Sequence, residues 1–295
     1  PAPAEPPSLV VLPFSNLGPG ADEDYFSDGL TEELIDRLVR VSGLDVVAST
    51  SSFALKERSG DVRALARELG VDFVLEGSVR RDGDRLRITA QLVDAGRGVH
   101  LWSKRFDSTL VDLFAVQDAI ADGIVDELGP RLASGTQLPA RAHPTNVLPA
   151  YELLLRGRHH LKRRDEDSIR RSIGLFQQAV DLDPAFAEAW RELARAYVLL
   201  PTYSYEDPDA MYAEAVAAIE RGAEVRPELR AAASDVLGLV HLNRWEWPEA
   251  ERAFRQALAA SPNDPSVRQW YSQLLANVGN PHESLVHILE AKRLD

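Results

Sequence analysis

The sequence contains no cysteine and only one methionine among its 295 residues. A disulfide framework, a cysteine nucleophile and a thiolate metal site are therefore excluded. The chain also lacks an apolar run of the roughly 20 residues that a membrane-spanning helix needs, and no segment has the features of a signal peptide. What remains is a composition typical of globular protein, with 45% hydrophobic and 27% charged residues.

Positive charge is also in short supply, because 33 basic residues face 46 acidic ones and leave a net charge of −13. This balance opposes binding to a nucleic-acid backbone, which requires a basic surface, and to an anionic membrane surface. We therefore expect a protein or peptide partner, with a small ligand and a homodimer as further possibilities. No nucleic acid and no inserted membrane segment are expected for this chain.

The length allows about two domains, at roughly 100–200 residues per domain. Four of the first seven residues are proline, which is typical of a stiff linker. We expect residues 1–7 to tether the chain to a missing N-terminal output domain. The composition then predicts an α/β domain over residues 8–133, a second linker over 134–150, and a helical domain over 151–295.

Residues 8–133 alternate between strand-like and helix-like patterns. In residues 85–93, Leu86, Ile88, Ala90 and Leu92 occupy every second position, which predicts a strand with one buried face. The pair Asp82-Gly83 before it predicts a tight hairpin turn. The whole pattern predicts a mixed sheet with packed helices. Its expected strands are residues 9–12, 44–48, 71–80, 85–93 and 99–106, and its expected helices are 27–41, 62–69 and 109–128.

Several strings of this domain, in order, closely resemble the TolB-like amino-terminal domain of bacterial signalling proteins. They are Val11–Leu17, Asp24–Glu32, Glu68–Val71, Leu75–Arg80 and His100–Trp102. The resemblance implies a non-enzymatic domain that occurs beside helical repeats. It further implies a parent chain with a winged-helix DNA-binding head (CadC-type regulators), a protein kinase or a nucleotide cyclase. We therefore expect a periplasmic, membrane-associated setting, with the cytoplasm as the alternative.

Residues 151–295 contain an internal repeat. The string that runs from Trp190 through Leu193 and Ala194 to Tyr197 fits the start of a tetratricopeptide (TPR) repeat. The trio Ala250, Phe254 and Ala257 returns 34 residues later as Ser284, Ile288 and Ala291, which is the TPR period. A longer interval earlier in the chain indicates an insertion of nine residues at about 199–209. We therefore predict an all-α superhelical domain of about four helix pairs.

Stacked repeats align one face of their first helices into a groove. Polar residues at these positions are the candidates for binding a peptide or ligand, although each taken alone is more often simply solvated. The predicted groove residues are Arg158, Lys162, Glu188, Arg191, Arg195, Asp235, Asn243, Gln269 and Gln273, with Tyr203 and Tyr205 of the insertion as a possible lip.

No catalytic, cofactor or metal site is expected. His282 and His287 are five residues apart, which places them on different faces of a helix. The string Asp24–Gly29 lacks the oxygen ligands of a calcium loop and is expected to be a capped acidic loop before a helix. Gly18-Pro19-Gly20 lacks the Lys-Ser/Thr of a phosphate loop. The basic cluster at residues 156–164 favours a solvated helix end or an interdomain contact over phosphate binding.

These observations together predict a non-catalytic sensor or interaction module of a bacterial signalling protein. The module would bind a protein, peptide or small ligand and relay the change to the absent output domain. The alternative is a structural module that dimerises or scaffolds its parent chain.

Overall fold

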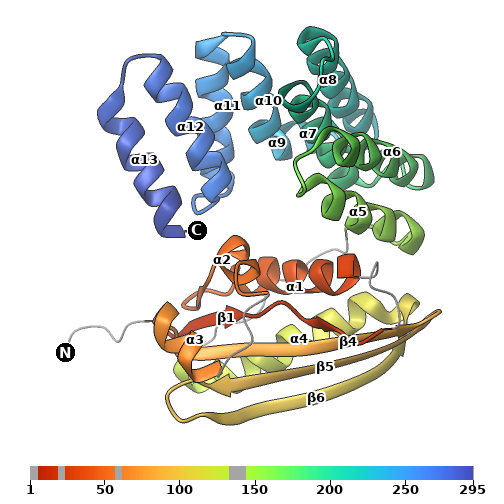
Figure 1. Cartoon of the computed structure of the whole chain (residues 1–295), viewed down its shortest axis with the longest axis vertical. Coiled ribbons are helices and arrows are strands. Elements are labelled where there is room, and N and C mark those ends of the chain that lie inside the picture. Colours follow the sequence, from red (N-terminus) through yellow and green to blue (C-terminus); the bar gives the residue numbers. More distant parts are fainter. Residues whose placement is uncertain (1–5, 19–23, 57–61, 133–143, 295) are drawn as a thin grey trace. The chain divides into compact units, whose positions relative to one another are not determined.

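A computed structural model describes residues 6–18, 24–56, 62–132 and 144–294 (Figure 1). The chain divides into two compact units between His143 and Pro144. Most of the predicted linkers lie outside the described residues. The exception is the end of the second linker, where helix α5 already begins at Leu148, three residues earlier than the helical domain was predicted to start.

The first unit is built on a six-stranded mixed sheet in the order β3-β1-β4-β5-β6, with β2 paired to β4. The short strands β1 and β3 run parallel to each other, and β1 also runs parallel to β4. The three long strands form an antiparallel meander. The strands are β1 (Ser8–Val11), β2 (Ser15–Asn16), β3 (Asp45–Val46), β4 (Phe73–Asp82), β5 (Arg85–Asp94) and β6 (Val99–Thr109).

The alternation in β5 determines which face of the sheet is buried. Leu86, Ile88, Ala90 and Leu92 are at most 2% exposed, as predicted. Gly83 takes a φ of 59° in the turn between β4 and β5, a conformation that glycine adopts without strain. The predicted mixed α/β arrangement is therefore confirmed for the first unit.

Four helices accompany the sheet: α1 (Asp24–Leu38), α2 (Ser49–Phe53), α3 (Val62–Leu69) and α4 (Leu113–Leu128). Figure 1 shows α4 lying across one face of the sheet. Trp102 of β6 packs so closely on Gly123 of α4 that a side chain at Gly123 would overlap the indole. The face beneath α4 is therefore the core side of β6.

Two predictions for the first unit were wrong in detail. The string Asp24–Gly29 is not a loop but the first turns of α1, where Lys56 contacts Asp24 at 3.3 Å and Asp28 at 2.7 Å. The last helix does not begin at Thr109, which is instead the final residue of β6. A 3₁₀ turn over Leu110–Asp112 precedes α4.

The second unit consists of helices, most of which pack as consecutive pairs (Figure 1). The pairs are α5–α6, α7–α8, α10–α11 and α12–α13, and α9 adds one turn before the third pair. The helices are α5 (Leu148–Leu161), α6 (Glu166–Leu182), α7 (Ala187–Tyr203), α8 (Pro208–Val225), α9 (Leu229–Ala232), α10 (Ser234–Asn243), α11 (Trp247–Ala260), α12 (Pro265–Asn277) and α13 (Pro281–Leu294).

Close approach within the pairs depends on glycine facing an aromatic ring. A Cβ atom at Gly238 would lie 2.6 Å from a ring carbon of Phe254, well inside van der Waals contact. Gly157 and Phe176 form the equivalent contact in the first pair. The interiors of these two pairs therefore tolerate no larger residue at the glycine positions without a shift of the ring.

Candidate functional site

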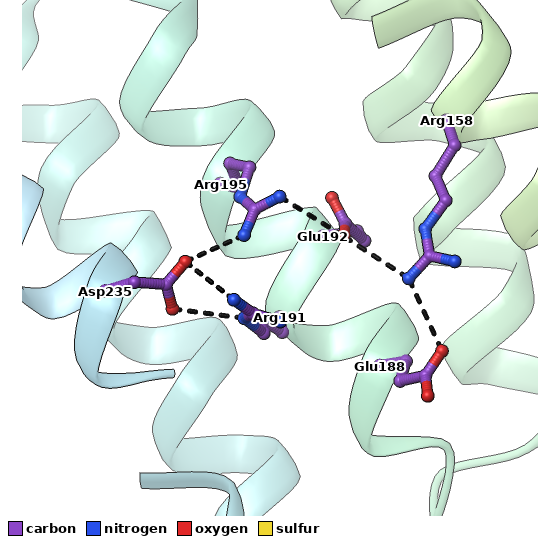
Figure 2. Close-up of polar contacts among 6 residues, drawn as sticks. All are labelled: Arg158, Glu188, Arg191, Glu192, Arg195 and Asp235. Carbon is purple, nitrogen blue, oxygen red and sulfur yellow. Dashed lines mark hydrogen bonds and ion pairs between the residues drawn. The ribbon is translucent and has the colours of Figure 1, made fainter. Parts of the chain in front are cut away.

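Six charged residues of α5, α7 and α10 meet on one side of the helical unit (Figure 2). We refer to them as the ion-pair network. All three helices are the first of their pairs, so the network links successive pairs. Its members are Arg158, Glu188, Arg191, Glu192, Arg195 and Asp235.

Asp235 of α10 is the most deeply buried member, at 1% exposure. Arg191 donates to both of its carboxylate oxygens, from Nη2 at 2.8 Å and from Nε at 3.1 Å. Arg195 donates from Nη2 at 2.7 Å. Because both arginines belong to α7, this one carboxylate holds the second pair against the third.

Glu192 connects the opposite side of the network and is 5% exposed. Its Oε1 atom lies 3.5 Å from Arg195 of the same helix and 3.4 Å from Arg158 of α5. Arg158 also lies 3.4 Å from Glu188. The contacts therefore run without interruption from the first pair to the third, as Figure 2 shows.

The arginine charges keep both buried carboxyls ionised. Burial alone would raise the pKa of Glu192, but the charges of Arg195 and Arg158 outweigh burial and lower that pKa. Burial likewise opposes ionisation of Asp235, and the charges of Arg195 and Arg191 lower its pKa below the ordinary value. Three guanidinium groups thus balance three carboxylates, and the network carries no net charge.

The structure brings together five of the nine predicted groove residues. Arg158, Glu188, Arg191, Arg195 and Asp235 are all members of the network. The other four have exposed side chains: Lys162 just beyond the end of α5, Asn243 at the end of α10, and Gln269 and Gln273 on α12.

Sequence reasoning missed two residues of this region. Glu192 follows Glu188 by four positions and precedes Arg195 by three, so helical spacing alone could have placed it on the same face. Trp270 of α12 lies beside the network, with the guanidinium carbon of Arg195 6.0 Å from its ring centroid. It adjoins the predicted Gln269 on α12.

The insertion at about 199–209 covers the end of α7, the connection after it and the start of α8. Tyr203 is 39% exposed and Tyr205 is fully exposed. Glu206, which follows them, pairs with Arg170 of α6 at 2.6 Å. The two predicted lip residues are therefore accessible and stand on a segment that is anchored to the first pair.

Among the described residues, no group of three or more histidine and acidic side chains is placed to hold a metal ion. His282 and His287 both lie on α13, and of the Gly18-Pro19-Gly20 string only Gly18 is described. In the described part of the chain, no helix has the length and apolarity needed to cross a membrane.

Comparison with protein families places a match over residues 5–123. The matching model is described as the HilA/YgeH-like transcriptional regulator, second domain. The match covers most of the α/β unit and excludes the helical unit.

Three curated relatives resemble the chain over different lengths. A putative adenylate cyclase 3 of Rhizobium meliloti is 41% identical over 188 residues, which is 64% of this chain and 32% of the relative. The Tol-Pal system protein TolB of Alkalilimnicola ehrlichii is 28% identical over 44% of this chain and 30% of its own length. The transcriptional regulator HilA of Salmonella typhimurium is 23% identical over 98% of this chain and 51% of its own.

Two solved structures are also similar in part. TolB from Acinetobacter baumannii aligns with a TM-score of 0.33 and 14% identity, over 44% of this chain and 30% of that one. MamA aligns with a TM-score of 0.35 and 18% identity, over 62% of this chain and 91% of that one.

The TolB-like resemblance inferred from the motifs therefore recurs in an independent sequence match, together with a regulator of the HilA type. The chain spans between about a third and a half of the length of the curated relatives it matches. These findings indicate a module of regulatory or signalling proteins.

Proposed function

We propose that this chain is the non-catalytic interaction module of a bacterial signalling protein. It binds a protein or peptide partner through its helical unit and relays the bound state to an output domain elsewhere in the parent chain. The observation that carries the proposal is that the same residues match two relatives with different printed functions, a transcriptional regulator and a putative cyclase. A region that is shared by proteins with two different outputs is best explained as the part that senses or binds.

The output is proposed to lie outside these residues. HilA is matched over 51% of its length and the cyclase over 32%, so each relative has a large remainder in which its own activity can reside. The net charge of −13 argues against DNA binding by this chain itself. We include CadC-type regulators and related kinase or cyclase fusions among the proposed parent chains.

The partner is proposed to bind along the first helices of a TPR-like array. Four exposed polar residues belong to the first helices of three pairs: Lys162 follows α5, Asn243 ends α10, and Gln269 and Gln273 lie on α12. The network itself is neutral, so its role in this proposal is to fix the spacing of the helices. Selectivity would come from the exposed polar residues and from Tyr205 on the insertion.

A peptide-display selection against the purified chain tests the proposal. Peptides that bind wild type are measured by calorimetry against a double variant, Lys162→Glu with Gln273→Glu, on the proposed face. The matched control is Arg252→Glu with Gln256→Glu on exposed positions of α11. We expect the face variant to lose affinity at least tenfold and the control to retain it. Equal binding by both variants would contradict the proposed face, and hydrolase or transferase activity of the purified chain would contradict the non-catalytic role.

We propose a periplasmic position for the module, on the outer side of the inner membrane, with the cytoplasm as the alternative. The support is the TolB-like resemblance and its association with membrane-tethered parents. A phosphatase fusion, active only outside the cytoplasm, and a green fluorescent fusion, fluorescent inside it, can be attached to the natural parent protein at the C-terminal side of the module. Phosphatase activity is the expected result, whereas fluorescence without phosphatase activity would favour the cytoplasm.

A further inference from the structure

The outer edge of β6 is long and has no neighbouring strand within the described residues. Strand β6 has 11 residues and is the last strand of the sheet, whereas an average strand has about five or six residues. None of the 11 described residues of β6 is buried, in contrast to β5, where six of ten are. A strand edge of this kind presents backbone N–H and C=O groups that can pair with another strand.

The part of β6 that is suited to pairing is well defined. The ladder between β5 and β6 is irregular at one point, where Leu92 pairs with Trp102 and Val93 with His100. From Trp102 to Thr109 the pairing is regular. The centre of the segment from Ser103 to Thr109 is Phe106.

Charges on this segment are arranged around that centre. Arg105 and Asp107 flank Phe106 and lie on the same face of the sheet, because side chains alternate along a strand. Arg105 is 63% exposed and Asp107 is 49% exposed. Within the chain, Asp107 lies opposite Arg87 of β5 and contacts its Nε at 2.5 Å, and its other carboxylate oxygen lies 3.1 Å from Nε of Arg105 on the same strand. A residue paired with Asp107 on the outer side of β6 would be its second cross-strand neighbour.

We propose that β6 pairs with β6 of a second copy of this chain, antiparallel, with Phe106 on the twofold axis. In this register Arg105 of each copy lies directly opposite Asp107 of the other, and Phe106 lies opposite Phe106. Opposite charges facing each other across strands are stabilising, and aromatic pairs add to them. Ser103 lies opposite Thr109, and Lys104 opposite Ser108, so no like charges meet within the segment.

The charge pattern selects this register over its neighbours. If Arg105 were on the twofold axis, the Arg105 side chains of the two copies would lie opposite each other. If Asp107 were on the axis, the two Asp107 carboxylates would lie opposite each other. Like charges directly opposite are destabilising. The contact is isologous, as in most homodimers, and it joins the two sheets into one continuous sheet. Because a single strand pair buries little area, we expect a reversible dimer that forms at micromolar concentrations or above.

Single-cysteine cross-linking tests the register directly, since the chain has no cysteine of its own. Residues directly opposite across antiparallel strands have Cα atoms about 4.5–5.5 Å apart, within the range of a disulfide, whereas diagonal neighbours are about 7–8 Å apart. A mixture of Arg105→Cys and Asp107→Cys chains should therefore oxidise to a covalent dimer. Either variant alone should form at least tenfold less of it. Equal cross-linking by Arg105→Cys alone would overturn the register.

Sedimentation of the full 295-residue chain tests the interface itself. The weight-average mass of wild type should rise with concentration from 32.6 kDa towards twice that value. Arg105→Asp places two like-charged pairs at the interface and should weaken association about tenfold or more. Arg85→Asp, at an exposed position on the same face of β5 but away from the edge, should leave it unchanged. A monomer at every concentration, or equal weakening by both variants, would overturn the proposal.

Discussion

One surface pair of the sheet and the ion-pair network of the helical unit place charged residues in opposite environments. On the sheet, Arg87 and Asp107 pair at the surface, with 54% and 49% of their side chains exposed. In the helical unit, the side chain of Asp235 is 2% exposed and that of Glu192 is 6% exposed. Surface pairs contribute little to stability because water and salt screen them, whereas a buried charge without its partner is costly. Loss of one partner should therefore cost little in the Arg87–Asp107 pair and much in the ion-pair network.

Removal of one buried carboxylate should have the largest effect. Asp235→Asn leaves Arg191 and Arg195 without their shared anion and should lower the free energy of unfolding of the helical unit by about 3 kcal/mol. Urea unfolding followed by circular dichroism measures this. The matched surface variant, Asp107→Asn, should change stability by less than about 1 kcal/mol. Equal losses of stability in the two variants would contradict the expected difference between the buried network and the surface pair.

Acid should also destabilise the ion-pair network. The pKa values of Asp235 and Glu192 are lowered in the folded chain, so unfolded carboxyls bind protons first as the pH falls. The stability they contribute is complete above the ordinary values of 3.8 and 4.5 and is lost as the pH falls through the lowered values.

Unfolding curves at pH 7 and at about pH 3.5 measure this loss. We expect wild type to lose more stability between the two values than Asp235→Asn does, because the variant has already lost the titrating group. An identical loss in both proteins would show that Asp235 is not a source of acid sensitivity.

A smaller effect is expected in the turns between paired helices. Trp245 has a φ of 66° in the turn before α11, and Gly279 has a φ of 82° in the turn before α13. This left-handed conformation costs a non-glycine residue about 1 kcal/mol. Trp245→Gly should therefore stabilise the chain by up to about 1 kcal/mol, reduced by the loss of its contact with Trp247. Gly279→Ala is the converse variant and should destabilise by a similar amount in thermal unfolding.

The smallest effect should come from the other member of the surface pair. Arg87→Gln removes the cross-strand partner of Asp107 on β5 and should lower stability by less than about 1 kcal/mol. Its effect should also shrink at 1 M salt, where screening acts over about 3 Å. A persistent effect at high salt would indicate that this pair is less exposed to solvent than its side chains suggest.

Local sequence patterns predicted the helices and strands whose own residues alternate or repeat in the way that the element requires. Strand β5 was expected because its buried residues alternate. Helix α2 was missed because its sequence, Ser49–Phe53, is mostly serine and threonine, which favour helices weakly. A tertiary contact stabilises it instead, since the Ser52 hydroxyl donates to the backbone carbonyl of Val11. Information of this kind is not contained in any short window of sequence.

The candidate site was predictable as a face but not as a set of contacts. Helical spacing placed Glu188, Arg191 and Arg195 together. Their partner Asp235 lies 44 residues beyond Arg191, an interval lengthened by the insertion, so no simple repeat period connects the two. Glu192 was overlooked because it lies directly beside the core residue Leu193. Only the packing of α7 between α5 and α10 shows that its carboxylate is enclosed by two arginines.

The contact of α7 with Asp235 also has a mechanical consequence. A slip of α7 past α10 by one helical turn, or 5.4 Å, would remove Asp235 from reach of both Arg191 and Arg195. The junction between the second and third pairs should therefore resist extension up to a threshold force and then yield abruptly. The fourth pair meets the network through the ring of Trp270, a softer contact that deforms gradually.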